Sequence, residues 1–133
     1  MGQHAPVDSK LGKMYDEHIE LILKKDTDGL LAQYAEDAVL ISSFEKVPKY
    51  FRGHKELNEH FQGILGIDGL EVEIAFWAET ENPTTLMIVE KITMTIGGEE
   101  ANMRFADSWV LDEEGKIKIH FAGMTQYPDG SVA

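Results

Sequence analysis

Residues 70–127 alternate between apolar and polar side chains, and this pattern most narrows the folds open to the chain. In residues 70–79 apolar side chains stand at every second position, the period of a strand with one buried face. Turn signals at Asn82-Pro83, Gly97-Gly98 and Glu114-Gly115 separate three further strands, near residues 84–96, 101–112 and 116–127. Strands this long twist and curl, so we expect a curved, cone-shaped antiparallel sheet.

The first half of the chain predicts three helices. Apolar residues recur at helical spacing in residues 11–25, a shorter helix follows residues 26–29 and includes Ala35, and a third runs from about His54 to Leu65. Residues 38–41 read as a short buried strand and residues 45–52 as a loop. The order predicts an α+β fold in which the sheet wraps around three N-terminal helices. We expect a single domain over residues 1–133, with residues 1–7 flexible.

Charge and composition exclude several classes of function. The 24 acidic residues outnumber the 12 Lys and Arg, for a net charge of −12, whereas binding to nucleic acid or to an anionic membrane needs clustered positive charge. The absence of Cys removes disulfides, thiolate catalysis and zinc–thiolate sites. Residues 1–10 lack the apolar core of a signal peptide, and no apolar run reaches the ~18 residues of a membrane span. We therefore expect a cytoplasmic protein.

Three polar residues interrupt apolar rows and are the candidates for chemistry. His18 stands on the apolar stripe of the first helix, Glu90 in the alternating row 86–96, and Asp107 in the row 103–111. Burying such groups is costly unless they are paired or useful. If the sheet curls onto the first helix, all three face one enclosed volume of the kind that binds small molecules. The side chains expected to line it are Tyr15, Phe76, Phe105, Trp109, Ile119 and Phe121.

Several short phrases carry a family resemblance. They are Asp28-Gly29-Leu30-Leu31, Tyr34-Ala35-Glu36-Asp37-Ala38-Val39, Phe51-Arg52-Gly53-His54, Asp107-Ser108-Trp109 and Gly115-Lys116-Ile117. Their order, over residues 8–127, resembles the nuclear transport factor two-like superfamily, which includes SnoaL-like polyketide cyclases and ketosteroid isomerases. The resemblance implies a cystatin-like α+β roll. It implies little about the reaction, because this fold hosts isomerases, cyclases, dehydratases, epoxide hydrolases and non-catalytic domains.

The resemblance also implies roles for the candidates. Asp107 matches the carboxylic acid that steroid isomerases keep protonated to stabilise an oxyanion. His18 matches their second oxyanion donor, a tyrosine, and Tyr15 is an alternative donor. Their general base falls at Ser42, and serine cannot abstract a proton unaided. We therefore expect Glu90 to serve as the base, while Asp107 and His18 polarise a carbonyl or donate a proton.

Each candidate also has a purely structural explanation. Asp107 can be a paired carboxylate, and His18 a hydrogen-bonded core residue. Glu90 can form an ion pair with Lys118 or Arg104.

No metal or cofactor is expected. Glu56 and His60 share one face of the third predicted helix, but His54 lies six residues from His60, about 240° around the helix. Two ligands are too few for a stable metal site, and no third has suitable spacing.

Apolar residues are also expected on the outer face of the sheet, which predicts a homodimer through that face. They are Trp77, Met87, Val89, Ala106, Val110, Ala122 and Met124.

Two functions remain open. The first is a cofactor-independent acid/base enzyme, of isomerase, cyclase or dehydratase type, acting on an apolar carbonyl-bearing small molecule. The second is a non-catalytic module that binds an apolar ligand or a protein partner. The missing base at Ser42 favours the second function, whereas Asp107 and His18 favour the first.

Overall fold

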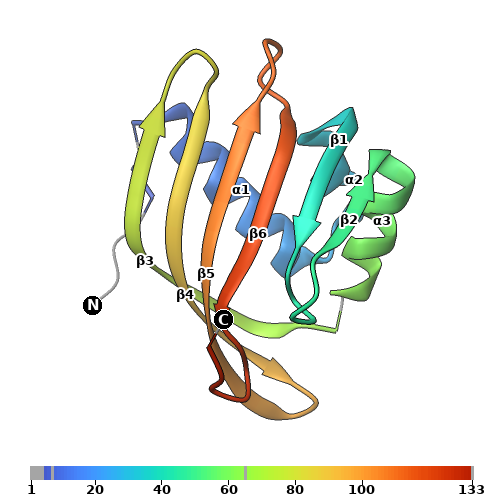
Figure 1. Cartoon of the computed structure of the whole chain (residues 1–133), viewed down its shortest axis with the longest axis vertical. Helices are drawn as coiled ribbons and strands as arrows, with labels where there is room; N and C mark the ends of the chain where they lie inside the picture. Colours follow the sequence, from blue (N-terminus) through green and yellow to red (C-terminus); the bar gives the residue numbers. More distant parts are fainter. Residues whose placement is uncertain (1–4, 7, 65, 133) are drawn as a thin grey trace.

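The computed structural model describes residues 5–6, 8–64 and 66–132. Within them it contains three helices and six strands, arranged as a curved sheet with helices against one face (Figure 1). The α+β fold predicted from the sequence is confirmed. The elements in chain order are α1 (Lys10–Lys24), α2 (Thr27–Ala32), β1 (Tyr34–Ser42), β2 (Lys49–Arg52), α3 (Gly53–Gly63), β3 (Asp68–Thr80), β4 (Thr85–Ile96), β5 (Glu99–Leu111) and β6 (Ile117–Gln126).

Side-chain caps define the starts of the first two helices. Ser9 Oγ accepts the amide of Gly12 at 3.1 Å, which begins α1, and Asp26 accepts the amide of Gly29 at 2.9 Å, which begins α2. The second helix is shorter than predicted, because Tyr34 pairs with Ile117 of β6 and so starts a strand. Strand pairing here overrides the local helical pattern.

The strand order is β2-β1-β6-β5-β4-β3. The four strands predicted in the second half are present as the antiparallel run β3–β6. The sheet as a whole is mixed, because β1 runs parallel to β6. Residues 49–52, predicted to be a loop, form β2 and pair with the end of β1. A four-residue, largely exposed strand has too short a pattern to be read from the sequence.

The helix α1 lies against the inner face of the sheet (Figure 1). The buried side chains of this face form two clusters, one at each end. At the helix-covered end, side chains of α1–α3 pack against strand residues that include Leu86, Ile88, Trp109 and Ile117. The methionine-lined end lies where β4 ends and β5 begins. Its buried residues are Ile92, Met94, Ala101, Met103, Phe105, Met124 and Tyr127.

The second part of β3 and most of β6 have the opposite facing from the one predicted. In β3 a bulge between Ile74 and Phe76 adds one residue, so Phe76 turns outward and is 54% exposed, while Trp77 packs against the core. In β6 the buried side chains are those of His120, Ala122 and Met124. A one-residue change of phase exchanges the two faces of a strand.

The prediction that Phe76, Ile119 and Phe121 line the cavity is therefore wrong. Ile119 and Phe121 are 39% and 41% exposed on the outer face. The same shift removes Trp77, Ala122 and Met124 from the predicted outer face.

Part of the predicted flexible segment is packed. Ala5 is buried, and the carbonyl of Pro6 lies so close to α1 that a Cβ on Gly12 would come within 1.9 Å of it. The rest of residues 1–7, and Leu65 at the predicted end of the third helix, lie outside the described residues. No helix among the described residues is long and apolar enough to cross a membrane.

Candidate functional site

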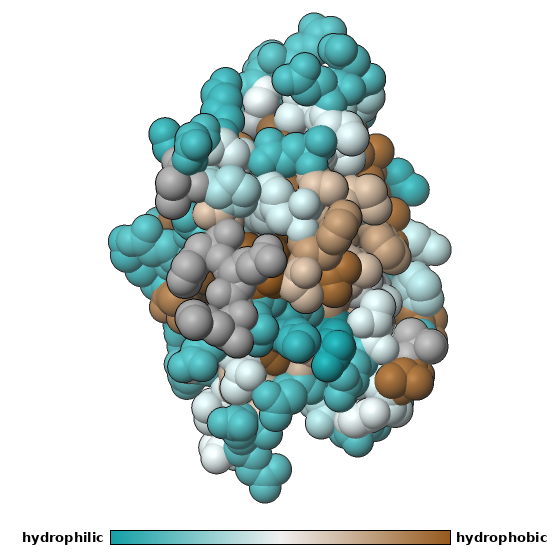
Figure 2. Space-filling view, turned by 90° about the vertical axis from the view of Figure 1, so that its left-hand side faces the viewer, coloured by the Kyte–Doolittle hydropathy of each residue, from teal (hydrophilic) through white to brown (hydrophobic). Residues whose placement is uncertain are grey.

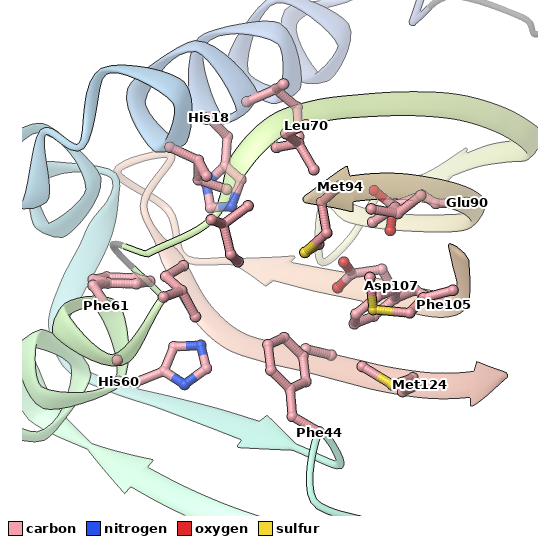
Figure 3. Close-up of a pocket in the computed structure, with 18 of the residues that line it drawn as sticks. His18, Phe44, His60, Phe61, Leu70, Glu90, Met94, Phe105, Asp107 and Met124 are labelled. Atoms are coloured by element: carbon pink, nitrogen blue, oxygen red, sulfur yellow. The ribbon is translucent and has the colours of Figure 1, made fainter. Parts of the chain in front are cut away.

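A cavity of about 560 Å³ lies between α1, α3 and the inner face of the sheet (Figure 3). This size is within the range of small-molecule sites. Its polar lining comes from several elements and consists of Tyr15, His18, His60, Glu90, Asp107 and His120. Its apolar lining includes Phe44, Leu70, Ile92, Met94, Met103, Phe105, Trp109 and Met124.

Two carboxyl groups lie next to each other on the sheet wall of this cavity. Glu90 on β4 pairs with Phe105, and Asp107 stands two residues further along β5, so the two side chains are diagonal neighbours on the inner face (Figure 3). The side chain of Asp107 is 15% exposed, whereas Glu90 is only 2% exposed. Asp107 is therefore the more accessible carboxyl.

Glu90 has the environment of a protonated acid. Its Oε2 accepts a hydrogen bond from the hydroxyl of Tyr15, while Oε1 is buried and has no partner among the described residues. Burial, reinforced by the nearby Asp107, raises the pKa of Glu90 well above its ordinary value. Lys118 and Arg104, the partners in the structural explanation, are both exposed, and no ion pair to either occurs in the described part of the chain.

Asp107 is the end of a hydrogen-bonded chain. Its Oδ1 lies 2.6 Å from Nε2 of His120, and Nδ1 of His120 lies 2.7 Å from the hydroxyl of Tyr34. Burial raises the pKa of Asp107 to about 7 and lowers that of His120 to about 4. His120 is therefore neutral at pH 7. When Asp107 is ionised, Nε2–H of His120 donates to it and the Tyr34 hydroxyl donates to Nδ1.

His18 is buried at the helix side of the cavity. Its Nδ1 lies 2.9 Å from Oε1 of Gln33, and Nε2 of Gln33 donates to the backbone carbonyl of Met14 at 3.1 Å. The imidazole packs against Trp109, with ring centroids 5.1 Å apart. Burial, with a smaller effect of His120, lowers the pKa of His18 to about 3, so this ring is also neutral.

Sequence reasoning missed two histidines of the cavity. His120 fills the same inward row as Ala122 and Met124, the row that was predicted to face outward when Ile119 and Phe121 were expected inside. His60 on α3 packs among the rings of Phe44 and Phe51, and burial lowers its pKa to about 4. The three candidates for chemistry were predicted to share one enclosed volume. All of them line this cavity: His18, Glu90 and Asp107.

The weakly indicated metal ligands do not come together. Glu56 Oε1 accepts the amide of Arg52 at 2.9 Å, which places it at the start of α3, while His60 lies on the cavity side. Among the described residues no group of three His, Asp or Glu side chains has a geometry that could hold a metal ion.

Ser42, the position of the steroid-isomerase base, does not line the cavity. Its Oγ accepts the amide of Phe44 at 3.3 Å, and it borders a separate hollow beside β2. Ser42 therefore does not supply the general base that steroid isomerases have at this position.

Comparisons with known proteins agree with this architecture. The model of the SnoaL-like domain matches residues 15–120, so this chain belongs to the SnoaL-like domain family, and the resemblance to the nuclear transport factor two-like superfamily is confirmed. No curated protein matches the chain at a significant level.

Three solved structures illustrate the range of proteins with this fold. A structure from Xanthomonas campestris, described as a calcium/calmodulin dependent protein kinase II association domain, has a TM-score of 0.76 at 15% identity, covering 92% of this chain and 93% of that one. The epoxide hydrolase/cyclase-like enzyme SalBIII, described as acting in pyran ring formation in the polyether salinomycin, has a TM-score of 0.69 at 15% identity. The match covers 84% of this chain and 88% of SalBIII. A computationally designed 17-OHP binder has a TM-score of 0.70 at 16% identity, with 81% and 87% covered. At such identities the likeness shows the fold alone.

The arrangement combines the elements of acid/base chemistry in an apolar enclosure. A protonated Glu90 lies beside Asp107, whose raised pKa makes both of its protonation states accessible near neutral pH. Neutral imidazoles line the other walls. Such a site can hold a mostly apolar molecule and exchange one proton with it.

Proposed function

We propose that this protein is a cofactor-independent acid/base enzyme, of isomerase, cyclase or dehydratase type, acting on an apolar, carbonyl-bearing small molecule. The observation that carries the proposal is the Glu90–Asp107 carboxyl pair in a cavity of about 560 Å³. A pKa of about 7 for Asp107 suits a group that must both accept and return a proton. The SnoaL-like membership supports a small-molecule role, as does the cyclase-like relative.

The geometry favours a division of roles different from the one expected from the sequence. Asp107 is the more accessible carboxyl and becomes the group that moves the proton, while Glu90, held by Tyr15, keeps a proton behind it. In its acid form the pair donates a hydrogen bond to a carbonyl oxygen. In its base form it accepts a proton from a neighbouring carbon or hydroxyl.

A ligand screen beside Asp107→Asn tests this proposal. We expect one class among steroids, polyketide-like aromatics and terpenoids to raise the melting temperature of the wild type, because a ligand of the folded state stabilises it by linkage. The shift should collapse in Asp107→Asn but persist in Glu71→Gln, a matched carboxyl-to-amide change at an exposed position of β3. Compounds that bind are then incubated with both proteins and followed for chemical change. An Asp107→Asn variant that melts far below wild type, with no ligand effect in either protein, would make Asp107 structural and remove the proposal.

A non-catalytic binding module is the second candidate. The observation that favours it is that Asp107 already has a hydrogen-bond partner in His120, while Ser42 lies outside the cavity. A ligand that raises the melting temperature and is recovered unchanged after prolonged incubation would favour this candidate over the enzyme.

We also propose a homodimer through the outer face of the sheet. Apolar side chains extend across that face from β3 to β6: Val89 pairs with both Phe76 and Ala106, and Val110 pairs with Ile119. Figure 2, which views the side of the molecule next to β3, shows apolar side chains gathered among hydrophilic ones. The exposed apolar residues of this face are Phe76, Met87, Val89, Ile119 and Phe121. Such a surface favours association when it can be buried.

Sedimentation velocity at micromolar concentration tests the dimer. We expect the wild type to sediment as a dimer and Phe121→Glu as a monomer, because a charge buried within this face is left without a partner. Lys55→Glu, an exposed charge change on α3, should leave the dimer intact. A wild-type monomer at that concentration would remove the proposal.

A further inference from the structure

The side chain of Gln33 is held in one orientation by two contacts. Its Nε2 lies 3.1 Å from the backbone carbonyl of Met14, which can only accept, so the amide NH₂ faces that carbonyl. The carbonyl oxygen, Oε1, then faces Nδ1 of His18 at 2.9 Å. Turning the amide over would bring two acceptors together at Met14. Gln33 is itself 6% exposed, so water does not readily replace either contact.

This orientation determines which nitrogen of His18 carries the proton. An acceptor at Nδ1 requires Nδ1–H, and in a neutral imidazole the other nitrogen, Nε2, then carries a lone pair. Nε2 forms no hydrogen bond within the described parts of the chain, and His18, 7% exposed, lines the cavity (Figure 3). Trp109 packs against the imidazole with its ring centroid 5.1 Å away, which restrains its orientation.

We infer that His18 presents a fixed hydrogen-bond acceptor, Nε2, to the molecule in the cavity, that Gln33 is the residue that positions it, and that the ligand carries a hydroxyl group at this point. The inference takes two things from the proposed function: the cavity as the ligand site, and the carbonyl group at the carboxyl pair. It reverses the role that the sequence suggested for His18. A nitrogen without a proton cannot donate to a carbonyl oxygen or an oxyanion, and two acceptors repel. The ligand class becomes an apolar molecule with a hydroxyl facing α1 and its carbonyl facing the carboxyl pair.

His120 provides an internal reference for this assignment. Its Nδ1 faces the hydroxyl of Tyr34 and its Nε2 faces the carboxyl group of Asp107, so its proton lies on Nε2 when Asp107 is ionised. The two rings have centroids 6.0 Å apart and similar burial, but in that state their partners require opposite tautomers. Any general effect of the cavity on imidazoles would act on both, whereas their hydrogen-bond partners distinguish them.

Long-range ¹⁵N–¹H NMR of the ¹⁵N-histidine-labelled full chain at pH 7 measures the tautomers without a ligand or an activity assay. We expect His18 as Nδ1–H, and His120 as Nε2–H in the molecules whose Asp107 is ionised. In Gln33→Leu the acceptor is gone, so the His18 signal should move toward the Nε2–H form, while Gln33→Glu, which keeps an acceptor, should retain Nδ1–H. A wild-type His18 that is Nε2–H or doubly protonated overturns the inference, even where a variant fails to fold.

A pair of probes tests the ligand. We expect 4-cyclohexylphenol to shift the unprotonated Nε2 resonance of His18 upfield, as a hydrogen bond to that nitrogen does, and 4-cyclohexylanisole, its methyl ether, to leave it in place. Both compounds can fill the apolar part of the cavity, so the difference reports the hydroxyl alone. Equal shifts with both compounds, or no shift with the phenol at its solubility limit, overturn the ligand assignment. Neither readout depends on turnover, so a failure of the acid/base proposal leaves these outcomes separately readable.

Discussion

The two ends of the sheet's inner face come from the same strands but differ in what covers them. At the helix-covered end, Leu86, Ile88 and Ile117 are almost fully buried against helical side chains and do not line the cavity. At the methionine-lined end, Met94, Met103 and their neighbours border the cavity. We expect the side chains buried away from the cavity to contribute most to stability, and the methionines that border it to contribute most to binding. Flexible, polarisable methionine side chains suit the binding end, because they adapt to varied apolar shapes.

Truncation at the two ends should give the largest contrast. Leu86→Ala removes contacts on all sides of a side chain with 0% exposure, and we expect a loss of about 3 kcal/mol in the free energy of unfolding. Met103→Ala enlarges a space that already exists, so its loss should lie at the low end of the range for such truncations, about 2 kcal/mol. Urea denaturation at pH 7 measures both. Equal losses, or a larger loss at Met103, would contradict the division between the ends.

The carboxyl pair lies near the junction of the two ends, and its effect on stability should depend on pH. Burial raises the pKa of Glu90 in the folded protein, so the native state binds more protons than the unfolded state above the ordinary pKa of 4.5. The contribution of the protonated Glu90 carboxyl to stability is complete below that pH and is lost as the pH rises. Glu90→Gln keeps an acceptor for Tyr15 and cannot ionise. We therefore expect the free energy of unfolding of the variant, relative to that of the wild type, to increase by up to about 1.4 kcal/mol per pH unit above pH 5. Urea denaturation from pH 5 to pH 9 measures this difference.

Comparison of the two proteins isolates Glu90 from the other buried titratable groups. Because the pKa of Asp107 is raised to about 7, its contribution to the free energy of unfolding also falls as the pH rises, over an overlapping range. The cavity histidines have lowered pKa values, so their contribution increases as the pH rises toward 6.5. These groups are present in both proteins and largely cancel in the difference. The exposed control Glu71→Gln should show no pH-dependent difference. A flat difference for Glu90→Gln would mean that Glu90 ionises as readily in the folded protein as in the unfolded one.

The fold was more predictable from the sequence than the site, and particular residues show why. Long alternating strands and capped helices are local patterns, so β3–β6 and α1 follow from them. The bulge after Ile74 depends on pairing with β4, and no residue pattern in β3 marks it. That single extra residue turns Phe76 outward, whereas the alternating pattern had predicted that it faces inward.

The inward facing of β6 depends on partners distant in the sequence. His120 lies inside because Tyr34 and Asp107 satisfy both of its nitrogens, and neither is near it in the chain. Three cavity residues could be identified from the sequence, because each is a single polar residue in an otherwise apolar strand or helix pattern. They are His18, Glu90 and Asp107. Their protonation states depend mainly on burial, and the hydrogen bonds of His18 to Gln33 and of Glu90 to Tyr15 come from residues that only the three-dimensional arrangement brings into contact with them.

Conservative exchanges should give the smallest effects and the finest distinction between the two ends. Met103→Leu and Ile117→Leu each keep the side-chain volume, so each should change the free energy of unfolding by less than about 1.5 kcal/mol. Only Met103 lines the cavity, and leucine cannot adapt its shape as methionine does. We expect Met103→Leu to change the Kd of 4-cyclohexylphenol, measured by calorimetric titration, by about threefold or more, and Ile117→Leu to leave it within the error of the measurement. If Ile117→Leu alters the Kd as much as Met103→Leu does, the helix-covered end also shapes the binding site, and the separation of stability from binding along the sheet does not hold.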